Sequence, residues 1–265
     1  MQDQPLFGYL MRDLQSGVKA LKEALPFVRR HRLWVGVLSY GWVSKFLLII
    51  AIVIGLNFFA VLVNWLGSVR ADSVIAYGAS VLDLYSNMFK KGYHLFSLGG
   101  MKYLIMILAE VLVFHASRRS VEILKGEKAG DVSLKTFMRA QIRMIKMSLA
   151  AWGLELGVTI LISIALGVMH ADWLKSPLNW MVQSFFLGAV VIDGYFEHFH
   201  LRMKASFLLS KQMTGIALTV GAAAYLLMSV PLAGPVIAPF FASIAATLAL
   251  FEMEAKGLIP IKLNI

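Results

Sequence analysis

The chain contains no cysteine and few charged residues. Without cysteine, disulfide bonds, thiolate catalysis and zinc or iron–sulfur sites with cysteine ligands are all excluded. Charged residues make up only 15% of the 265 residues, whereas a soluble domain carries about a quarter. Hydrophobic residues make up 59%, and the mean hydropathy is +0.74. Such a chain cannot cover a water-facing surface with polar groups, so its composition predicts an all-α protein with several helices that cross a lipid bilayer.

The motifs of soluble enzymes are also missing. The sequence has no P-loop, no dinucleotide-binding fingerprint, no zinc-protease motif and no nucleophile elbow, so we expect neither an enzyme nor a bound cofactor. The 25 Lys and Arg residues outnumber the 15 Asp and Glu residues. They lie beside apolar runs rather than on a separable domain, which argues against nucleic-acid binding. We expect no signal peptide, because the first long apolar run begins only near Lys45.

The long apolar runs predict one transmembrane domain over residues 1–265. The first run is long enough to cross about 30 Å of hydrocarbon as a helix. We expect four full spans, at Phe46–Gly67, Phe96–Ser117, Met147–Met169 and Pro177–Ile192. Lys102 lies near the outer end of the second span, from which we expect it to snorkel to the interface.

The last apolar tract, 213–251, is too long for one helix. Pro231, Gly234 and Pro235 interrupt it, and prolines with a glycine stop and turn a helix. We predict a helical hairpin with arms at Met213–Ser229 and Val236–Phe251. Because each arm is short for a span, the hairpin either crosses a thin region or penetrates only part of the bilayer.

The segments between the spans are polar or amphipathic. Residues 1–45 contain an amphipathic helix at Leu6–Val28, residues 118–146 are basic, and residues 193–212 form a second interfacial helix. In the basic segment, Gly126–Gly130 should separate two helices, with Asp131 or Ser133 capping the second. Lys and Arg concentrate in alternate segments. This places both termini, including the tail 252–265, in the cytoplasm.

Two acidic residues lie inside apolar runs, Glu110 in the second span and Glu155 in the third. An unpaired carboxylate inside the bilayer is costly, so each must face the bundle interior, pair, or bind a proton. The two spans run in opposite directions, and both residues lie at similar depth, so they could share one polar path. One interpretation is a proton-coupling or gating role. The other is a carboxylate bonded to Trp, Ser or Asn neighbours for packing.

The remaining polar clusters each have two interpretations. Arg29 and Arg30 belong to a basic cluster that binds anionic lipid head groups or collects an anionic substrate at a funnel mouth. His198 and His200 beside acidic residues suggest a metal site, but residues two apart diverge on a helix, which argues against it. Small residues recur every four positions at Ala238, Ala242 and Ala246, and at Ala217 and Gly221, which favours tight helix pairing or oligomerisation.

Several motifs carry a family resemblance. They are the acidic-aromatic turn Asp193-Gly-Tyr-Phe-Glu197, the amphipathic helix that ends near Lys211, and the proline-rich stretch from Val230 to Pro239, with Pro231, Pro235 and Pro239. Near the N-terminus, Arg29 follows Pro26-Phe-Val. On these motifs the chain resembles the CysZ sulfate-permease family, which is related to the etoposide-induced membrane proteins. Phe27 stands where members of that family have glycine.

The resemblance implies an inner-membrane permease or channel of bacteria for sulfate or a related inorganic anion. Arg29 falls on the family's anion-binding position, and Arg30 lies beside it. Our alternative is a membrane scaffold or an accessory subunit of a complex. In both cases we expect membrane lipids and a homo-oligomer or larger complex as partners.

Overall fold

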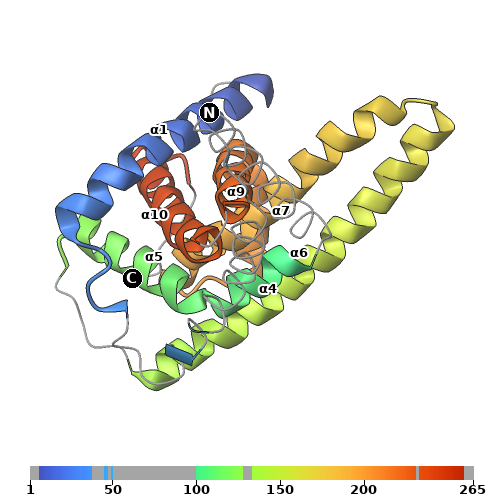
Figure 1. Cartoon of the computed structure of the whole chain (residues 1–265). Coiled ribbons are helices and arrows are strands. Elements are labelled where there is room, and N and C mark those ends of the chain that lie inside the picture. Colours follow the sequence, from blue (N-terminus) through green and yellow to red (C-terminus); the bar gives the residue numbers. More distant parts are fainter. Residues whose placement is uncertain are drawn as a thin grey trace, which may run out of the picture.

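The structure is a computed structural model that describes residues 6–37, 45, 46, 49, 100–127, 133–230 and 233–259 (Figure 1). This part of the chain is helical and has no strand, which confirms the all-α prediction. Its elements are α1 (Leu6–His31), α4 (Met101–Leu108), α5 (Glu110–Lys125), α6 (Leu134–Val168), the 3-10 helix η2 (Asp172–Leu174), α7 (Lys175–His198), α8 (Met203–Gln212), α9 (Thr214–Met228) and α10 (Gly234–Ala255).

Among the described helices, α6 and α10 are each long and apolar enough to cross a membrane. The pair of α8 and α9 adds a third candidate if it is one span that bends by 98°. These apolar helices are compatible with a membrane-embedded protein. The predicted first span, Phe46–Gly67, lies outside the described residues except at residues 46 and 49.

Helix α6 is longer than the predicted third span, because the second half of the basic segment continues into it without a break. Its 35 residues extend over about 50 Å. The side chain of Ser133 accepts a hydrogen bond from the backbone N–H of Thr136 at 3.2 Å, which confirms the predicted cap. Gly126 ends α5 with a left-handed φ of 71°, so the break between these helices is confirmed as well.

The second predicted span is interrupted in its described part. Helix α4 ends at Leu108 and α5 begins at Glu110, with Ala109 between them in a non-helical conformation. The backbone N–H groups of Leu112 and Val113 both bond to the carbonyl of Ala109. Neither proline nor glycine lies at this break, and nothing in the local sequence explains it.

The acidic-aromatic segment is not a turn. Asp193 and Glu197 lie in the last turns of α7, which continues to His198, beyond the predicted end of the fourth span. Asp193 is buried and bonded to Arg143, so the last turns of α7 pack against α6. The chain then passes through residues 199–202 into α8.

The core lies where α9 packs against α7, α10 and α1. Helices α7 and α9 cross in backbone contact: a Cβ on Gly188 would lie 1.9 Å from the carbonyl oxygen of Ala217, and one on Gly221 would lie 1.8 Å from that of Ser184. The predicted tight helix pairing is therefore present within this chain. Ala238, Ala242 and Ala246 are also buried in it.

The two arms of the predicted hairpin correspond to α9 and α10, which pack against each other. Pro235 lies in the first turn of α10, where a missing N–H costs no helical bond. The prediction that Pro239 is a turn residue is wrong, because Pro239 lies within α10 and is buried there. Its missing N–H would have bonded to the carbonyl of Pro235 in the first turn. Pro231 lies outside the described residues.

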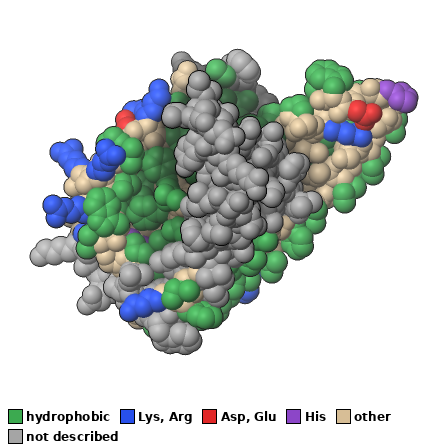
Figure 2. Space-filling model, viewed as in Figure 1, with side chains coloured by type: hydrophobic (Ala, Val, Ile, Leu, Met, Phe, Trp, Pro, Cys, Tyr) green, Lys and Arg blue, Asp and Glu red, His purple; other side chains and the backbone are tan. Residues whose placement is uncertain are grey.

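Helix α6 and the first part of α7 form a hairpin that projects from the rest of the bundle (Figure 1). Few residues in the apolar stretch of α6 are buried inside the chain. Hydrophobic side chains are exposed along this hairpin, while Lys and Arg side chains gather near α1 (Figure 2). The projecting hairpin therefore has a surface suited to lipid or to another apolar helix.

Candidate functional site

The first buried polar cluster contains Glu155 and joins α6 to α4. The ammonium of Lys102 lies 2.6 Å from Glu155 Oε1, and the hydroxyl of Tyr103 donates to Oε2 at 2.6 Å. The side chain of Lys102 is fully buried, and that of Glu155 is 4% exposed. We call Glu155, Lys102 and Tyr103 the Glu155 cluster. Both oxygens of its carboxylate have a partner.

The prediction that Lys102 snorkels is wrong. Its ammonium points into the bundle, where it also lies 5.3 Å from the ring centroid of Tyr103 and 5.7 Å from that of Tyr225. A buried ammonium needs a counter-charge, and the carboxylate of Glu155 supplies it. Because the two residues are far apart in the sequence, no local pattern indicates that they pair.

The second buried polar cluster is centred on Arg143 of α6. Its guanidinium makes a two-pronged ion pair with Asp193 of α7, with distances of 2.8 Å (Nε to Oδ2) and 2.6 Å (Nη2 to Oδ1). A third donor, Nη1, bonds to the carbonyl of Leu201 beyond the end of α7. These bonds fix the C-terminal end of α7 against α6.

Glu110 and Glu197 complete what we call the Arg143 cluster. Glu110 is 1% exposed, and its Oε2 has no hydrogen-bond partner among the described residues. Asp193, Glu197 and Arg143 all lie close enough to act on it electrostatically. The cluster thus contains three carboxyl groups and one guanidinium, and the guanidinium is already bound to Asp193. Glu110 and Glu155 are consequently in different clusters, and among the described residues no chain of hydrogen bonds or ion pairs joins them.

Glu197 lies at the outer side of the Arg143 cluster. Burial raises the pKa of Glu197 to about 7, with Arg143 opposing the rise and Asp193 adding to it. No hydrogen bond or ion pair joins its carboxyl group to another described residue. Glu197 is therefore a carboxyl group that can exchange a proton near neutral pH.

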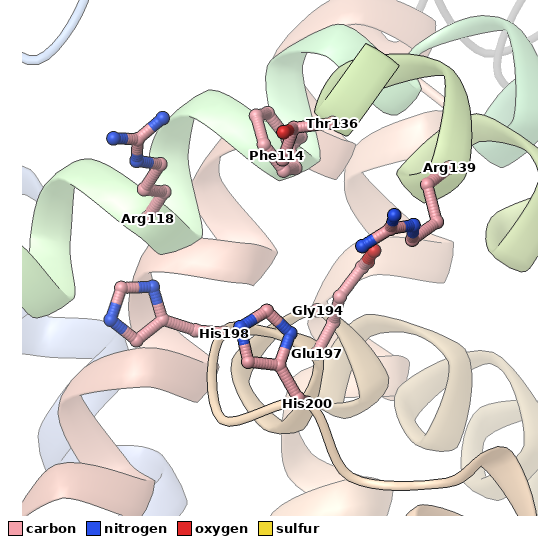
Figure 3. A pocket seen from close by; sticks show the side chains of 8 residues that line it. All are labelled: Phe114, Arg118, Thr136, Arg139, Gly194, Glu197, His198 and His200. Atoms are coloured by element: carbon pink, nitrogen blue, oxygen red, sulfur yellow. The ribbon is translucent and has the colours of Figure 1, made fainter. Parts of the chain in front are cut away.

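A cavity of about 260 Å³ adjoins Glu197. Helix α5 contributes Phe114 and Arg118 to its lining, α6 contributes Thr136 and Arg139, and α7 contributes Gly194, Glu197 and His198, followed by His200. Arg118, Arg139, Glu197 and both histidines line one space, although the guanidinium of Arg118 points away from the histidines in this view (Figure 3). Four of these five side chains can be cationic. We call this space the α5–α7 pocket.

His198 and His200 do not diverge as two residues on one helix would. His198 is the last residue of α7, while His200 lies in the following turn with a left-handed φ of 55°. This turn brings both imidazoles to the α5–α7 pocket (Figure 3). Burial lowers the pKa of His198, with smaller contributions from nearby charges. Within the described residues, no group of three or more His, Asp or Glu side chains is arranged to hold a metal ion.

Arg29 and Arg30 are exposed at the C-terminal end of α1. Arg32 follows them with a left-handed φ of 49°, and the N–H of Leu33 bonds back to the carbonyl of Val28. These arginines are thus placed on the surface and away from the buried clusters. Exposed Trp34 and Val35 follow the basic cluster.

Comparisons of this chain with protein-family models, with curated proteins and with solved structures give no match. The sequence pointed to Glu110 and Glu155 but not to Arg143, Lys102 or Tyr103. Arg139 and Arg143 are four apart in the basic segment, and this spacing was the available signal for a cationic helix face.

Proposed function

We propose that this chain is a multi-pass membrane protein that conducts a small inorganic anion of the sulfate type. In this proposal it lies in a bacterial inner membrane with both termini in the cytoplasm. The observation that carries the proposal is the Arg143 cluster, where Glu110, Asp193 and the guanidinium of Arg143 lie inside an apolar bundle with Glu197 at its outer side. Ionisable groups inside membrane helices are costly and usually mark ion or proton pathways. The resemblance to the CysZ family supplies the substrate class.

In this proposal the exposed Arg29 and Arg30 attract the anion to the cytoplasmic face, because their charge raises its local concentration. Glu110 takes up and releases a proton that gates the flux, since one of its oxygens is buried without a partner among the described residues. Glu155 is less suited to this role, because Lys102 and Tyr103 already bond to its carboxylate.

The test is sulfate flux into liposomes that contain the purified full chain, with and without a pH gradient. Arg29→Ala should reduce the flux, whereas Lys22→Ala, which removes an exposed cation from the same helix, should not. Glu110→Gln should remove the response to the pH gradient. The absence of sulfate flux under every pH gradient would rule the proposal out.

The second candidate is a scaffold or an accessory subunit of a membrane complex. The projecting part of α6 favours it, since a Cβ added at Gly153 or Gly157 would meet no described residue within 4 Å. Two glycines four residues apart on an apolar helix allow close approach of another helix. Recovery of a stoichiometric partner or a second copy from native membranes, lost in Gly157→Leu and kept in Gly126→Asn, would support this candidate. A chain that is monomeric in native membranes would contradict it.

A further inference from the structure

The α5–α7 pocket is open to the surface and rich in hydrogen-bond donors. Arg139 and His200 are exposed at its edge, while Arg118 and His198 are partly buried. Its volume of about 260 Å³ lies just below the range of roughly 300–1,000 Å³ for pockets that hold drug-sized ligands. The pocket therefore suits a small, strongly charged ligand.

Its two guanidinium groups come from different helices. Arg118 of α5 is oriented by an ion pair with Glu122, in which Nε lies 2.9 Å from Oε1. Arg139 of α6 makes no ion pair with a described residue. Guanidinium groups recognise oxyanions through paired N–H donors, and imidazoles and the hydroxyl of Thr136 can supply further hydrogen bonds.

The surrounding surface adds positive charge. A wider hollow of about 600 Å³ shares Arg139, Glu197 and His200 with the pocket and is also lined by Lys146 and Arg202. Cations on both sides of the entrance raise the local concentration of an anion. An anion is thus the class of ligand that this region favours.

Glu197 decides which anion fits. When Glu197 is ionised, a fully ionised anion such as sulfate meets its carboxylate with only lone pairs on both sides, which is repulsive. Inorganic phosphate and phosphate monoesters differ, because a phosphate oxygen can carry a hydrogen near neutral pH. That hydroxyl donates a hydrogen bond to the carboxylate of Glu197 while the other oxygens accept from Arg139 and the imidazoles of His198 and His200.

We infer that the α5–α7 pocket binds a phosphate group that carries a hydrogen, with Arg139 and the two histidines as donors and Glu197 as the acceptor that selects phosphate over sulfate. The ligand is either free inorganic phosphate or the monoester head group of phosphatidic acid, which present the same chemistry. The charged groups around Glu197 are Glu110 and Arg118 on α5, Arg139 and Arg143 on α6, Asp193 and His198 on α7, and His200. Binding here does not require transport, so this site stands apart from the proposed flux of sulfate.

The experiment is calorimetric titration of the purified full chain in phosphatidylcholine nanodiscs with sodium phosphate and, separately, sodium sulfate, at a pH above 7, where Glu197 is ionised. We expect phosphate to bind at least about tenfold more tightly than sulfate, the difference expected for one hydrogen bond to a charged group. Arg139→Gln should weaken phosphate binding by about tenfold for the same reason. Glu197→Gln should bring the two affinities close together, since an amide can donate to sulfate.

The matched control is Lys22→Gln, which removes an exposed cation from α1 and should leave phosphate binding unchanged. Because Arg139 is exposed, its replacement should leave the thermal unfolding midpoint at the wild-type value. A second arm uses nanodiscs with phosphatidic acid. Phosphatidic acid that co-purifies, and that Arg139→Gln loses, identifies the lipid as the source, and binding of phosphate alone identifies the free ion.

Wild-type protein that binds sulfate as tightly as phosphate would overturn the inference. The inference would also be overturned if Arg139→Gln changed neither phosphate binding nor phosphatidic acid binding. It would equally be overturned if the wild-type protein bound neither ligand. Sulfate flux without selective phosphate binding contradicts this inference alone. Selective phosphate binding without sulfate flux contradicts only the proposed function.

Discussion

The Glu155 cluster and the Arg143 cluster both hold carboxyl groups inside the same helical bundle, but they balance charge differently. In the Glu155 cluster one carboxylate meets one ammonium and one phenol hydroxyl. In the Arg143 cluster one guanidinium faces three carboxyl groups. The first arrangement is complete, as expected of groups that fix two helices together. The second leaves an oxygen of Glu110 without a partner among the described residues. A proton or a ligand can therefore act on the second cluster.

The largest expected effect tests whether the Glu155 cluster is a completed pair. Lys102→Met should destabilise the protein by about 3–5 kcal/mol, because it leaves Glu155 buried without its counter-charge. Thermal unfolding or proteolysis in detergent measures the loss. The double variant Lys102→Met with Glu155→Leu should recover most of it. If Lys102→Met alone has the stability of the wild type, the pair does not fix these helices.

The next effect concerns the guanidinium at the centre of the Arg143 cluster. Arg143→Gln should cost about 3 kcal/mol, since Asp193 then remains buried beside two further carboxyl groups. Adding Asp193→Asn should restore part of this loss in the same unfolding assay. Lys256→Gln removes a cation from an exposed pair with Glu252 and should cost less than about 1 kcal/mol.

A smaller effect is the dependence of stability on pH. The pKa of Glu197 rises from an ordinary 4.5 to about 7 through burial. Below pH 4.5 the carboxyl group is protonated in both the folded and the unfolded state. Between pH 4.5 and about 7, Glu197 loses its proton in the unfolded chain before it does so in the folded protein. The stability should therefore fall as the pH rises and should level off above about 7. We expect a loss of about 2 kcal/mol, allowing for partial exposure.

Unfolding midpoints measured across this pH range test the effect. Glu197→Gln should flatten the profile, while Glu23→Gln on the exposed face of α1 should leave it unchanged. A wild-type profile that rises over the same range would show that another group controls it.

The smallest effect is the change in stability at Glu110, which we compare with that at Glu155. Glu110→Gln should change stability by less than about 1 kcal/mol or increase it slightly, because Oε2 of Glu110 has no bond to lose. Glu155→Gln should cost more, since it leaves the buried ammonium of Lys102 without a counter-charge. Equal losses in the two variants, measured by the same unfolding assay, would remove the distinction between the clusters.

Much of the local structure was predictable. The apolar stretches of α6 and α10, the end of α5 at Gly126 and the Ser133 cap follow from nearby residues. The break at Ala109, the continuation of α7 through Glu197 and the burial of Lys102 were not predicted. Each depends on a partner from another helix or on a backbone geometry that has no local signal. The predicted first span and Pro231 lie outside the described residues and stay predictions.

The candidate sites divide in the same way. The sequence by itself determined that the chain is an all-α protein with apolar helices, and that Glu110 and Glu155 lie among apolar neighbours, because composition and run length suffice for both. Only the tertiary structure decided that Lys102 belongs to Glu155, that Arg143 belongs to Asp193, and that His198 and His200 share a pocket with Arg118 and Arg139. The physical reason is that charge pairing acts over a few ångströms in space, between residues that lie about 50 apart in the chain.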